Sequence, residues 1–148
     1  MTTCNKHSIC DGHKPIDGEM TTENTILIVD DEPHILSGTS RLFRKAGFRV
    51  IEAQNGEQGL QLAKAHAPDL VLLDIVLPDI DGLTVCRKLK ADPDTTDLFV
   101  CILSGKKIGP TDKSIGLDIG ADDYIARPIS NRELRSRVKA LFRIINAE

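Results

Sequence analysis

The chain has 148 residues, of which 41% are hydrophobic and 28% are charged, so it is long and apolar enough to fold around one core. Its formal net charge of -3 argues against the basic surface that binds nucleic acid, so no direct nucleic-acid partner is expected. No apolar run approaches the ~20 residues that span a bilayer, and the polar N-terminus lacks the apolar stretch of a signal peptide. A cytoplasmic protein without a membrane partner is therefore expected.

Residues 1–23 have no sustained apolar pattern and are interpreted as a flexible N-terminal leader, which leaves residues 24–148 as the folded domain. Within this leader, thiol and imidazole groups recur every three residues, at Cys4, His7, Cys10 and His13. Such groups suit zinc, but their spacing is shorter than in zinc fingers and no apolar residues accompany them to form a small core. A metal site in the leader therefore stays open as a minor alternative.

Five short runs rich in Ile, Val and Leu follow the leader, and each is typical of a buried parallel strand. The predicted strands are Thr25–Val29, Phe48–Ala53, Asp69–Leu73, Leu98–Leu103 and Asp123–Ala126. The predicted helices are Pro33–Ala46, Gly56–Ala67, Asp81–Ala91, Pro110–Ile119 and Ser130–Ile145. Because strands and helices alternate strictly and crossovers are right-handed, the pattern favours a doubly wound α/β fold, a three-layer sandwich.

Polar or charged side chains follow four of the predicted strands: Asp30 and Asp31 the first, Asp74 the third, Ser104 the fourth and Arg127 the fifth. In doubly wound sheets the functional crevice lies beyond the carboxyl ends of the strands, so these side chains should converge. Three carboxylates in one crevice repel one another unless a hard divalent cation lies among them, and Mg²⁺ fits best. Any single Asp could equally be a helix cap, but the three together favour a magnesium site.

Four segments resemble the receiver domains of response regulators, with order and spacing preserved from about Thr25 to the last helix. The segments are ILIVDDEP at 26–33, LVLLDIVLPDIDG at 70–82, ILSG at 102–105 and GADDYIARP at 120–128. This resemblance, to the CheY-like superfamily of two-component signalling, implies a flavodoxin-like (βα)5 fold. Its parallel five-stranded sheet would have the order 2-1-3-4-5.

The resemblance also implies a chemistry for the strand ends. Asp74 would accept a phosphoryl group from a phosphohistidine on a histidine kinase or phosphotransfer protein, with Mg²⁺ as cofactor. Asp31 would bind the metal directly and Asp30 largely through water, with Asp74 and the backbone carbonyl of Val76 as further ligands. An aspartyl carboxylate can attack phosphorus in line when cations neutralise the transferring oxygens. The domain would assist its own phosphorylation and dephosphorylation and would not be a conventional enzyme.

Two further residues match the switch of the family. The Ser104 hydroxyl would donate a hydrogen bond to a phosphoryl oxygen, and Tyr124 would then pack inward. The altered surface would comprise the helix at 110–119, strand 123–126 and helix 130–145, through which a homodimer could also form. Ser104 could instead merely shape its turn, and Tyr124 could be a half-buried residue with its hydroxyl in water.

Arg127 departs from the family pattern, which normally has a lysine before the proline of the last strand–helix loop. Both side chains are cationic, but a guanidinium is planar and larger than an ammonium group. We expect Arg127 to reach Asp74 and a phosphoryl oxygen, so that phosphorylation is retained. The missing lysine leaves open a pseudo-receiver, not phosphorylated, that serves as a constitutive protein–protein docking module. A haloacid-dehalogenase-like phosphatase would need an aspartate where this chain has Val76.

The sequence ends at or just after its last predicted helix, so it is expected to be either a single-domain regulator or part of a longer protein. The run RPISNREL at 127–134 resembles receivers that are joined to sensor histidine kinases. A downstream protein target or a fused kinase or output domain is therefore expected as the second partner.

Overall fold

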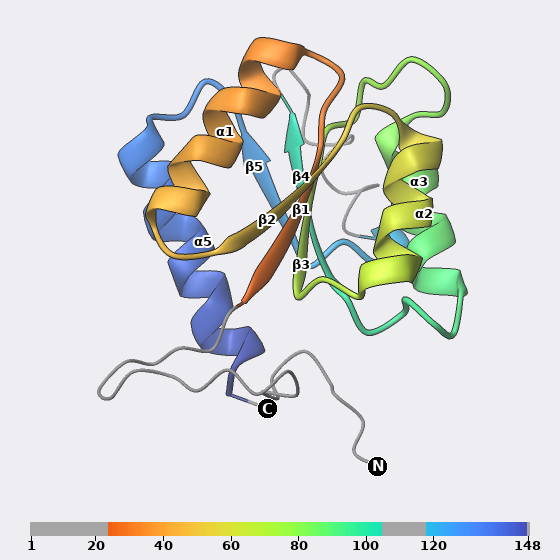
Figure 1. The fold of residues 1–148 in the computed structure, drawn as a ribbon. Coiled ribbons are helices and arrows are strands. Elements are labelled where there is room, and N and C mark those ends of the chain that lie inside the picture. Colours follow the sequence, from red (N-terminus) through yellow and green to blue (C-terminus); the bar gives the residue numbers. More distant parts are fainter. Residues whose placement is uncertain (1–23, 105–117, 148) are drawn as a thin grey trace.

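The structure, a computed structural model, describes residues 24–104 and 118–147, which form five strands and four helices (Figure 1). The strands are β1 (Thr25–Val29), β2 (Arg49–Ala53), β3 (Leu70–Leu73), β4 (Phe99–Ser104) and β5 (Asp123–Ala126). The helices are α1 (Pro33–Lys45), α2 (Gly56–His66), α3 (Gly82–Ala91) and α5 (Asn131–Ile145). Strands and helices alternate from β1 to β4, and α5 follows β5, as the sequence predicts.

Several predictions concern segments outside the described residues. The leader at 1–23, with its four thiol and imidazole groups, lies there, and so does most of the helix predicted at 110–119. In the part of the chain that the structure does describe, no helix combines the length and the apolar character needed to cross a bilayer.

Helices α3 and α5 begin one residue later than predicted because the preceding residue caps the helix. The Asp81 carboxylate accepts a hydrogen bond from the Thr84 amide at 2.8 Å. The Ser130 hydroxyl accepts one from the Glu133 amide at 3.0 Å, which is the serine half of a capping box. Both caps satisfy amide groups that have no partner within the first helical turn.

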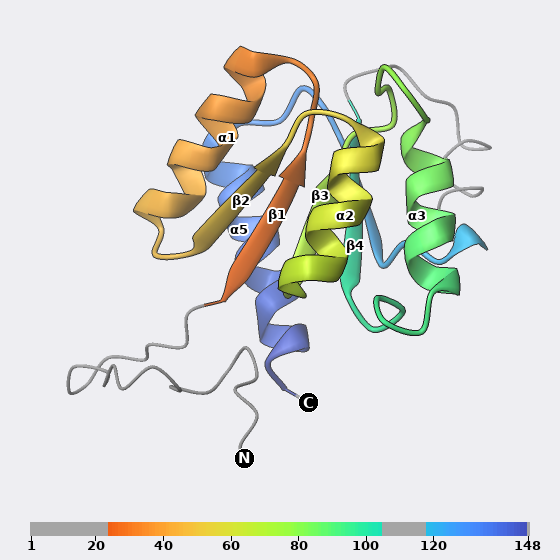
Figure 2. The ribbon, with the colours of Figure 1, turned by 45° about the vertical axis from the view of Figure 1, so that its right-hand side comes forward.

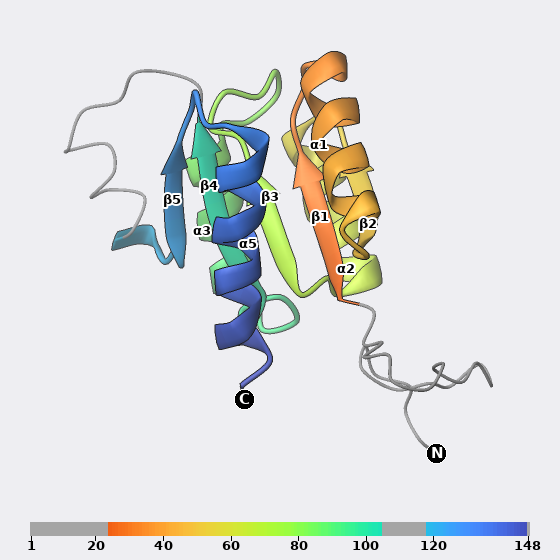
Figure 3. The ribbon, with the colours of Figure 1, turned by 90° about the vertical axis from the view of Figure 1, so that its left-hand side faces the viewer.

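The sheet is parallel throughout and its strand order is β2-β1-β3-β4-β5, which confirms the predicted order and the doubly wound fold. Helices α1 and α5 lie on one face of the sheet, and α2 and α3 lie on the other (Figures 1 and 3). This arrangement gives the three layers that the alternation of strands and helices predicts.

Side chains of β1 alternate between the two faces, and both sets are buried. Ile26 and Ile28 belong to the core beneath α1 and α5, whereas Leu27 and Val29 belong to the core beneath α2 and α3. All four are at most 2% exposed. A strand covered on both faces must be apolar at every position, which explains why this segment reads as a continuous apolar run rather than an alternating one.

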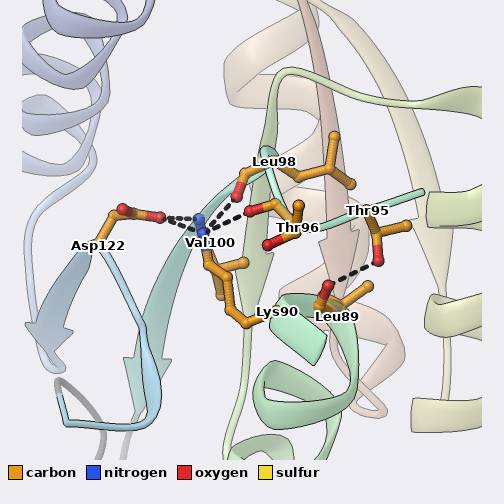
Figure 4. Close-up of polar contacts among 7 residues, drawn as sticks. All are labelled: Leu89, Lys90, Thr95, Thr96, Leu98, Val100 and Asp122. Atoms are coloured by element: carbon orange, nitrogen blue, oxygen red, sulfur yellow. Dashed lines mark hydrogen bonds and ion pairs between the residues drawn. The ribbon is translucent and has the colours of Figure 1, made fainter. Parts of the chain in front are cut away.

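A charged side chain joins three segments at the edge where the strands begin (Figure 4). Lys90 Nζ, at the end of α3, donates to the Leu98 carbonyl at 2.8 Å and lies 3.0 Å from Asp122 Oδ2. The same Asp122 oxygen accepts a hydrogen bond from the Val100 amide at 2.9 Å. The ion pair therefore holds together the segments that lead into β4 and β5. These segments lie at the end of the sheet opposite to the carboxyl ends of the strands.

Candidate functional site

The residues after β1 and β3 are placed by backbone hydrogen bonds that continue the sheet beyond the strands. The Asp30 amide donates to the Ala53 carbonyl at 3.0 Å, and the Asp74 amide donates to the Val29 carbonyl at 3.1 Å. Because β1 and β3 are parallel neighbours, these two aspartates emerge side by side at the same edge.

The structure brings together the three carboxylates predicted to share a metal ion. Asp30, Asp31 and Asp74 each offer a carboxylate oxygen, and these oxygens all lie within 4.8 Å of one another. Asp30 is only 2% exposed, Asp74 is partly buried and Asp31 is exposed. The cluster therefore extends from the protein interior to solvent.

Arg127 lies on the buried side of this cluster. Its Nη1 is 3.3 Å from Asp30 Oδ2, and its side chain is 16% exposed. The other Asp30 oxygen accepts a hydrogen bond from the Glu32 amide at 3.0 Å. The backbone amide of Arg127 donates to the Ser104 carbonyl at 2.8 Å, which fixes the start of this loop beside the end of β4. Arg127 thus lies at the site, but its ion pair is with Asp30 rather than with Asp74, which we expected it to reach.

The environment of Asp74 disfavours its charged form. Burial of the carboxyl group and, next, the negative charge of Asp30 raise its pKa above the ordinary value. The Val76 amide, 3.4 Å from Asp74 Oδ1, and the charge of Arg127 oppose this shift but do not cancel it. The site therefore has excess negative charge that a cation would neutralise.

The loop after Asp74, residues 75–81, is tightly folded against the site. The Gly82 amide donates to the Ile75 carbonyl at 2.7 Å. A methyl group at Gly82 would overlap the Asp74 carbonyl oxygen, so only glycine allows this close approach of backbone to backbone. Val76 lies in this loop, and its side chain is exposed. Its backbone amide donates a hydrogen bond to the Asp74 carboxylate.

Ser104 and Tyr124 lie on neighbouring strands and on the same face of the sheet. Tyr124 is paired in register with Ile102, and Ser104 is two residues further along the same strand. Ser104 is fully buried, and Tyr124 is 5% exposed within the core beneath α2 and α3. The alternative of a half-buried Tyr124 with its hydroxyl in water is therefore wrong.

The donor set fits a hard divalent cation. Carboxylate oxygens from two adjacent strand ends converge, and one of the groups is buried. Burial and, next, the charge of Asp30 raise the pKa of Asp74. Mg²⁺ prefers oxygen ligands and is commonly held by one or two carboxylates together with water and phosphate oxygens. Asp30, Asp31 and Asp74 are the groups that could hold it.

Sequence reasoning missed Asp79, whose carboxylate accepts hydrogen bonds from the Gly56 and Glu57 amides, both at 2.8 Å. The only signal in the sequence is an acidic residue between Pro78 and Ile80. Nothing in the local pattern indicates that its partners are more than 20 residues away.

Residues 26–139 match the family described as "Response regulator receiver domain". Over 118 residues the chain is 40% identical to the alkaline phosphatase synthesis transcriptional regulatory protein PhoP of Bacillus subtilis, a match that covers 80% of this chain and 48% of PhoP. The chain thus spans about half the length of the curated relatives it matches. The name of PhoP describes a transcription regulator, so the prediction that nucleic acid is not a partner finds no support among these relatives.

Solved structures show the same architecture. A CheY-like receiver domain protein from Methanospirillum hungatei superimposes with a TM-score of 0.78 at 27% identity, over 84% of this chain and 98% of that one. The signal receiver domain of a signal transduction histidine kinase from Syntrophus aciditrophicus has a TM-score of 0.72 and 32% identity, over 80% and 89% of the respective chains. Both agree with the flavodoxin-like fold predicted from the sequence.

Proposed function

Because the chain belongs to the response regulator receiver family, we propose that Asp74 accepts a phosphoryl group from a phosphohistidine on a histidine kinase or phosphotransfer protein. Receiver domains are signalling domains rather than conventional enzymes. The observation that carries the proposal is the meeting of three carboxylates within 4.8 Å at the carboxyl ends of the strands, with a cation beside them. This is the arrangement that phosphoryl transfer to a carboxylate requires.

The residues that would hold Mg²⁺ are Asp30, Asp31, Asp74 and the backbone carbonyl of Val76. When bound, the ion would neutralise charge on the transferring phosphoryl oxygens. Asp31 is the most exposed of the three carboxylates and is free of the ion pair that engages Asp30, so it is suited to direct ligation. Asp30, which is already bonded to Arg127 and to the Glu32 amide, is suited to contact the ion through water.

In the proposed transfer, one Asp74 carboxylate oxygen attacks phosphorus and forms a new P–O bond. The P–N bond of the donor phosphohistidine breaks, and its electron pair remains on the imidazole nitrogen of the partner. The positive charge of Arg127 acts on the same site, since it opposes the rise in the pKa of Asp74. The Ser104 hydroxyl, at the end of the adjacent strand, would donate a hydrogen bond to a phosphoryl oxygen.

We propose that the signal leaves the site through Ser104 and Tyr124. Both residues lie on one face of neighbouring strands, so a shift at the end of β4 can alter the packing of the β5 side chain. The surface of β5 and α5, together with residues 110–119, would then bind a downstream target, a fused domain or a second copy. In this proposal residues 24–148 are the receiver domain and residues 1–23 are a leader.

Intact-mass measurement after treatment with acetyl phosphate tests the proposal. The native chain should gain the mass of one phosphoryl group in the presence of Mg²⁺ and should gain none when the metal is chelated. The Asp74→Asn variant is the control and should not be labelled. Labelling of that variant to the native level would show that Asp74 is not the acceptor.

The ion pair between Arg127 and Asp30 favours a second function, in which the domain is a pseudo-receiver that docks partners without phosphorylation. A guanidinium that stays bound to Asp30 would keep the phosphoryl site closed. Beryllofluoride with Mg²⁺ distinguishes the two functions. A competent receiver should bind this phosphoryl mimic and shift the signals of Tyr124, whereas a pseudo-receiver should not respond.

A further inference from the structure

Asp79 lies in the loop between β3 and α3, and its carboxylate reaches the first turn of α2. Oδ1 accepts a hydrogen bond from the Gly56 amide and Oδ2 accepts one from the Glu57 amide, both at 2.8 Å. The hydrogen bond from Glu57, with that from Gly56, holds the pKa of Asp79 below its usual range, so the carboxylate is ionised at neutral pH. A negative charge at the beginning of a helix is also favoured by the helix dipole.

These hydrogen bonds do not replace a missing helix cap. Asn55 already caps α2, because its Oδ1 accepts a hydrogen bond from the Gln58 amide at 2.8 Å. Asn55 is adjacent to the helix, whereas Asp79 is 22 and 23 residues from its two partners. The bonds of Asp79 therefore join two distant segments, and the loop is tied to α2 by its side chain.

Apolar packing reinforces this link at the neighbouring position. Gly56 lies so close to the loop that a methyl group at this position would overlap the side chains of Ile80 and Val85. Ile80 also packs against the core beneath α2 and α3, which lie side by side in Figure 2. Two consecutive loop residues, one polar and one apolar, thus hold the loop against the start of α2.

The loop is held by two separate sets of contacts. Near Asp74, the Gly82 amide bonds to the Ile75 carbonyl at 2.7 Å, and Gly82 is in close contact with the Asp74 backbone. Within the loop, Asp79 bonds to α2. Val76 lies in the sequence between Ile75 and Asp79, which take part in these two sets of bonds.

We propose that Asp79 is a positioning residue for the metal site. It ties the loop to α2 and thereby holds the Val76 carbonyl and Asp74 in place for a divalent cation, which Asp79 itself does not touch. This inference rests on the proposed function, because it concerns the same metal site. Residues that orient metal ligands commonly change metal affinity about 10- to 100-fold when they are replaced.

Titration of the full chain with Mg²⁺ alone, followed by NMR shifts of the Asp74 and Ile75 amides, tests the proposal. We expect Asp79→Ala to raise the Mg²⁺ dissociation constant about tenfold, because the loop loses one anchor. Asp79→Asn keeps one acceptor oxygen and should lie between the native chain and the alanine variant. Asn55→Ala is the matched control, since it removes a cap from the same helix without freeing the loop, and it should leave Mg²⁺ affinity unchanged.

Acetyl phosphate labelling supplies a second readout. The Mg²⁺ concentration that gives half-maximal labelling should rise in Asp79→Ala, while the rate at saturating Mg²⁺ should return to the native value. A loss of the saturated rate without a change in the half-maximal concentration would overturn the proposal.

The NMR outcomes are also decisive. Native Mg²⁺ affinity in a folded Asp79→Ala, or an equal loss of affinity in Asn55→Ala, would overturn the positioning role and leave the proposed function intact. If Asp79→Ala does not fold, the same comparison between Asp79→Asn and Asn55→Ala decides. Absence of Mg²⁺ binding by the native chain would overturn both proposals, and that result is recognised without any variant.

Discussion

Arg127 Nη1 lies 3.3 Å from Asp30 Oδ2, so the cation that follows β5 pairs with the acidic residue that follows β1. Two strands, β3 and β4, separate β1 from β5 in the sheet. The long guanidinium side chain therefore crosses the carboxyl edge of the sheet and reaches the buried end of the aspartate cluster. Because of this position, Arg127 forms the ion pair with the buried Asp30 carboxylate and also opposes the rise in the pKa of Asp74.

Replacement of Arg127 should separate the need for a cation from the need for a guanidinium. We expect Arg127→Lys to retain labelling of Asp74, because the positive charge stays. Arg127→Met should label about 100-fold more slowly, because a charge that stabilises the transferring oxygens is lost. It should also lower the free energy of unfolding by about 2 kcal/mol, since Asp30 becomes a buried unpaired carboxylate. Labelling rates by intact mass and urea denaturation measure the two effects.

The prediction that Arg127 supports phosphorylation would be contradicted if the native chain were not labelled while Arg127→Lys was labelled rapidly. Arg127 would then block the site, and the pseudo-receiver would be the correct function.

Asp74→Asn should stabilise the metal-free protein at neutral pH. The pKa of Asp74 is raised in the folded state, so folding is penalised once the carboxyl group ionises. The penalty is absent below the unfolded-state pKa of about 3.9, develops as the pH rises through the raised folded-state value, and is constant above it. Urea denaturation in the presence of a chelator should therefore show a higher free energy of unfolding for Asp74→Asn than for the native chain at pH 7.

The gain in Asp74→Asn should shrink towards zero as the pH falls well below about 3.9, because the carboxyl group is then neutral in both the folded and the unfolded state. A gain that grows on acidification would contradict the raised pKa and the like-charge repulsion that contributes to it. Asp81→Asn, which alters an exposed helix cap in the same loop, is a suitable comparison.

Ser104→Ala should uncouple phosphorylation from the switch. Asp74 should still be labelled, because its metal ligands are unchanged, but beryllofluoride should no longer shift Tyr124. The chain has one tyrosine and no tryptophan, so intrinsic tyrosine fluorescence reports this residue alone. Ser104→Thr keeps the hydroxyl group and should retain the response; equal responses in the Ala and Thr variants would rule out Ser104 as the trigger.

Lys90→Met should destabilise the fold without altering phosphorylation. The variant loses the ion pair with Asp122 and the hydrogen bond to Leu98, so the free energy of unfolding should fall by about 2 kcal/mol. These contacts lie where β4 and β5 begin (Figure 4), whereas Asp74 follows the carboxyl end of β3, so the labelling rate at saturating Mg²⁺ should not change. Lys88→Met, at an exposed position of the same helix, is the control and should leave stability nearly unchanged.

The bounds of the strands and helices could be predicted closely, because they depend on residues that are near one another in the sequence. β1 and β5 have the predicted bounds, and the apolar residues that indicated them lie within these strands. β2 begins one residue later than predicted because the Phe48 amide still bonds to the Phe43 carbonyl of the preceding helix end. The capping side chains of α3 and α5 caused similar one-residue differences.

The contacts within the site were only partly predictable. The parallel sheet explains why Asp30 and Asp74 meet, because both follow neighbouring strands. The choice of Asp30 as the partner of Arg127 depends on side-chain length and on which carboxylate is buried, which the sequence does not specify. The link from Asp79 to α2 depends on how the loop folds back across the molecule, so no periodicity indicates it.

A crystal structure of the chain with Mg²⁺ and beryllofluoride would test the central claim most directly. We predict one Mg²⁺ contacted by Asp31, Asp74 and the Val76 carbonyl, with Asp30 linked through water and the beryllofluoride group on an Asp74 oxygen. A structure in which Arg127 still fills the site and neither the ion nor the mimic is bound at Asp74 would contradict this account.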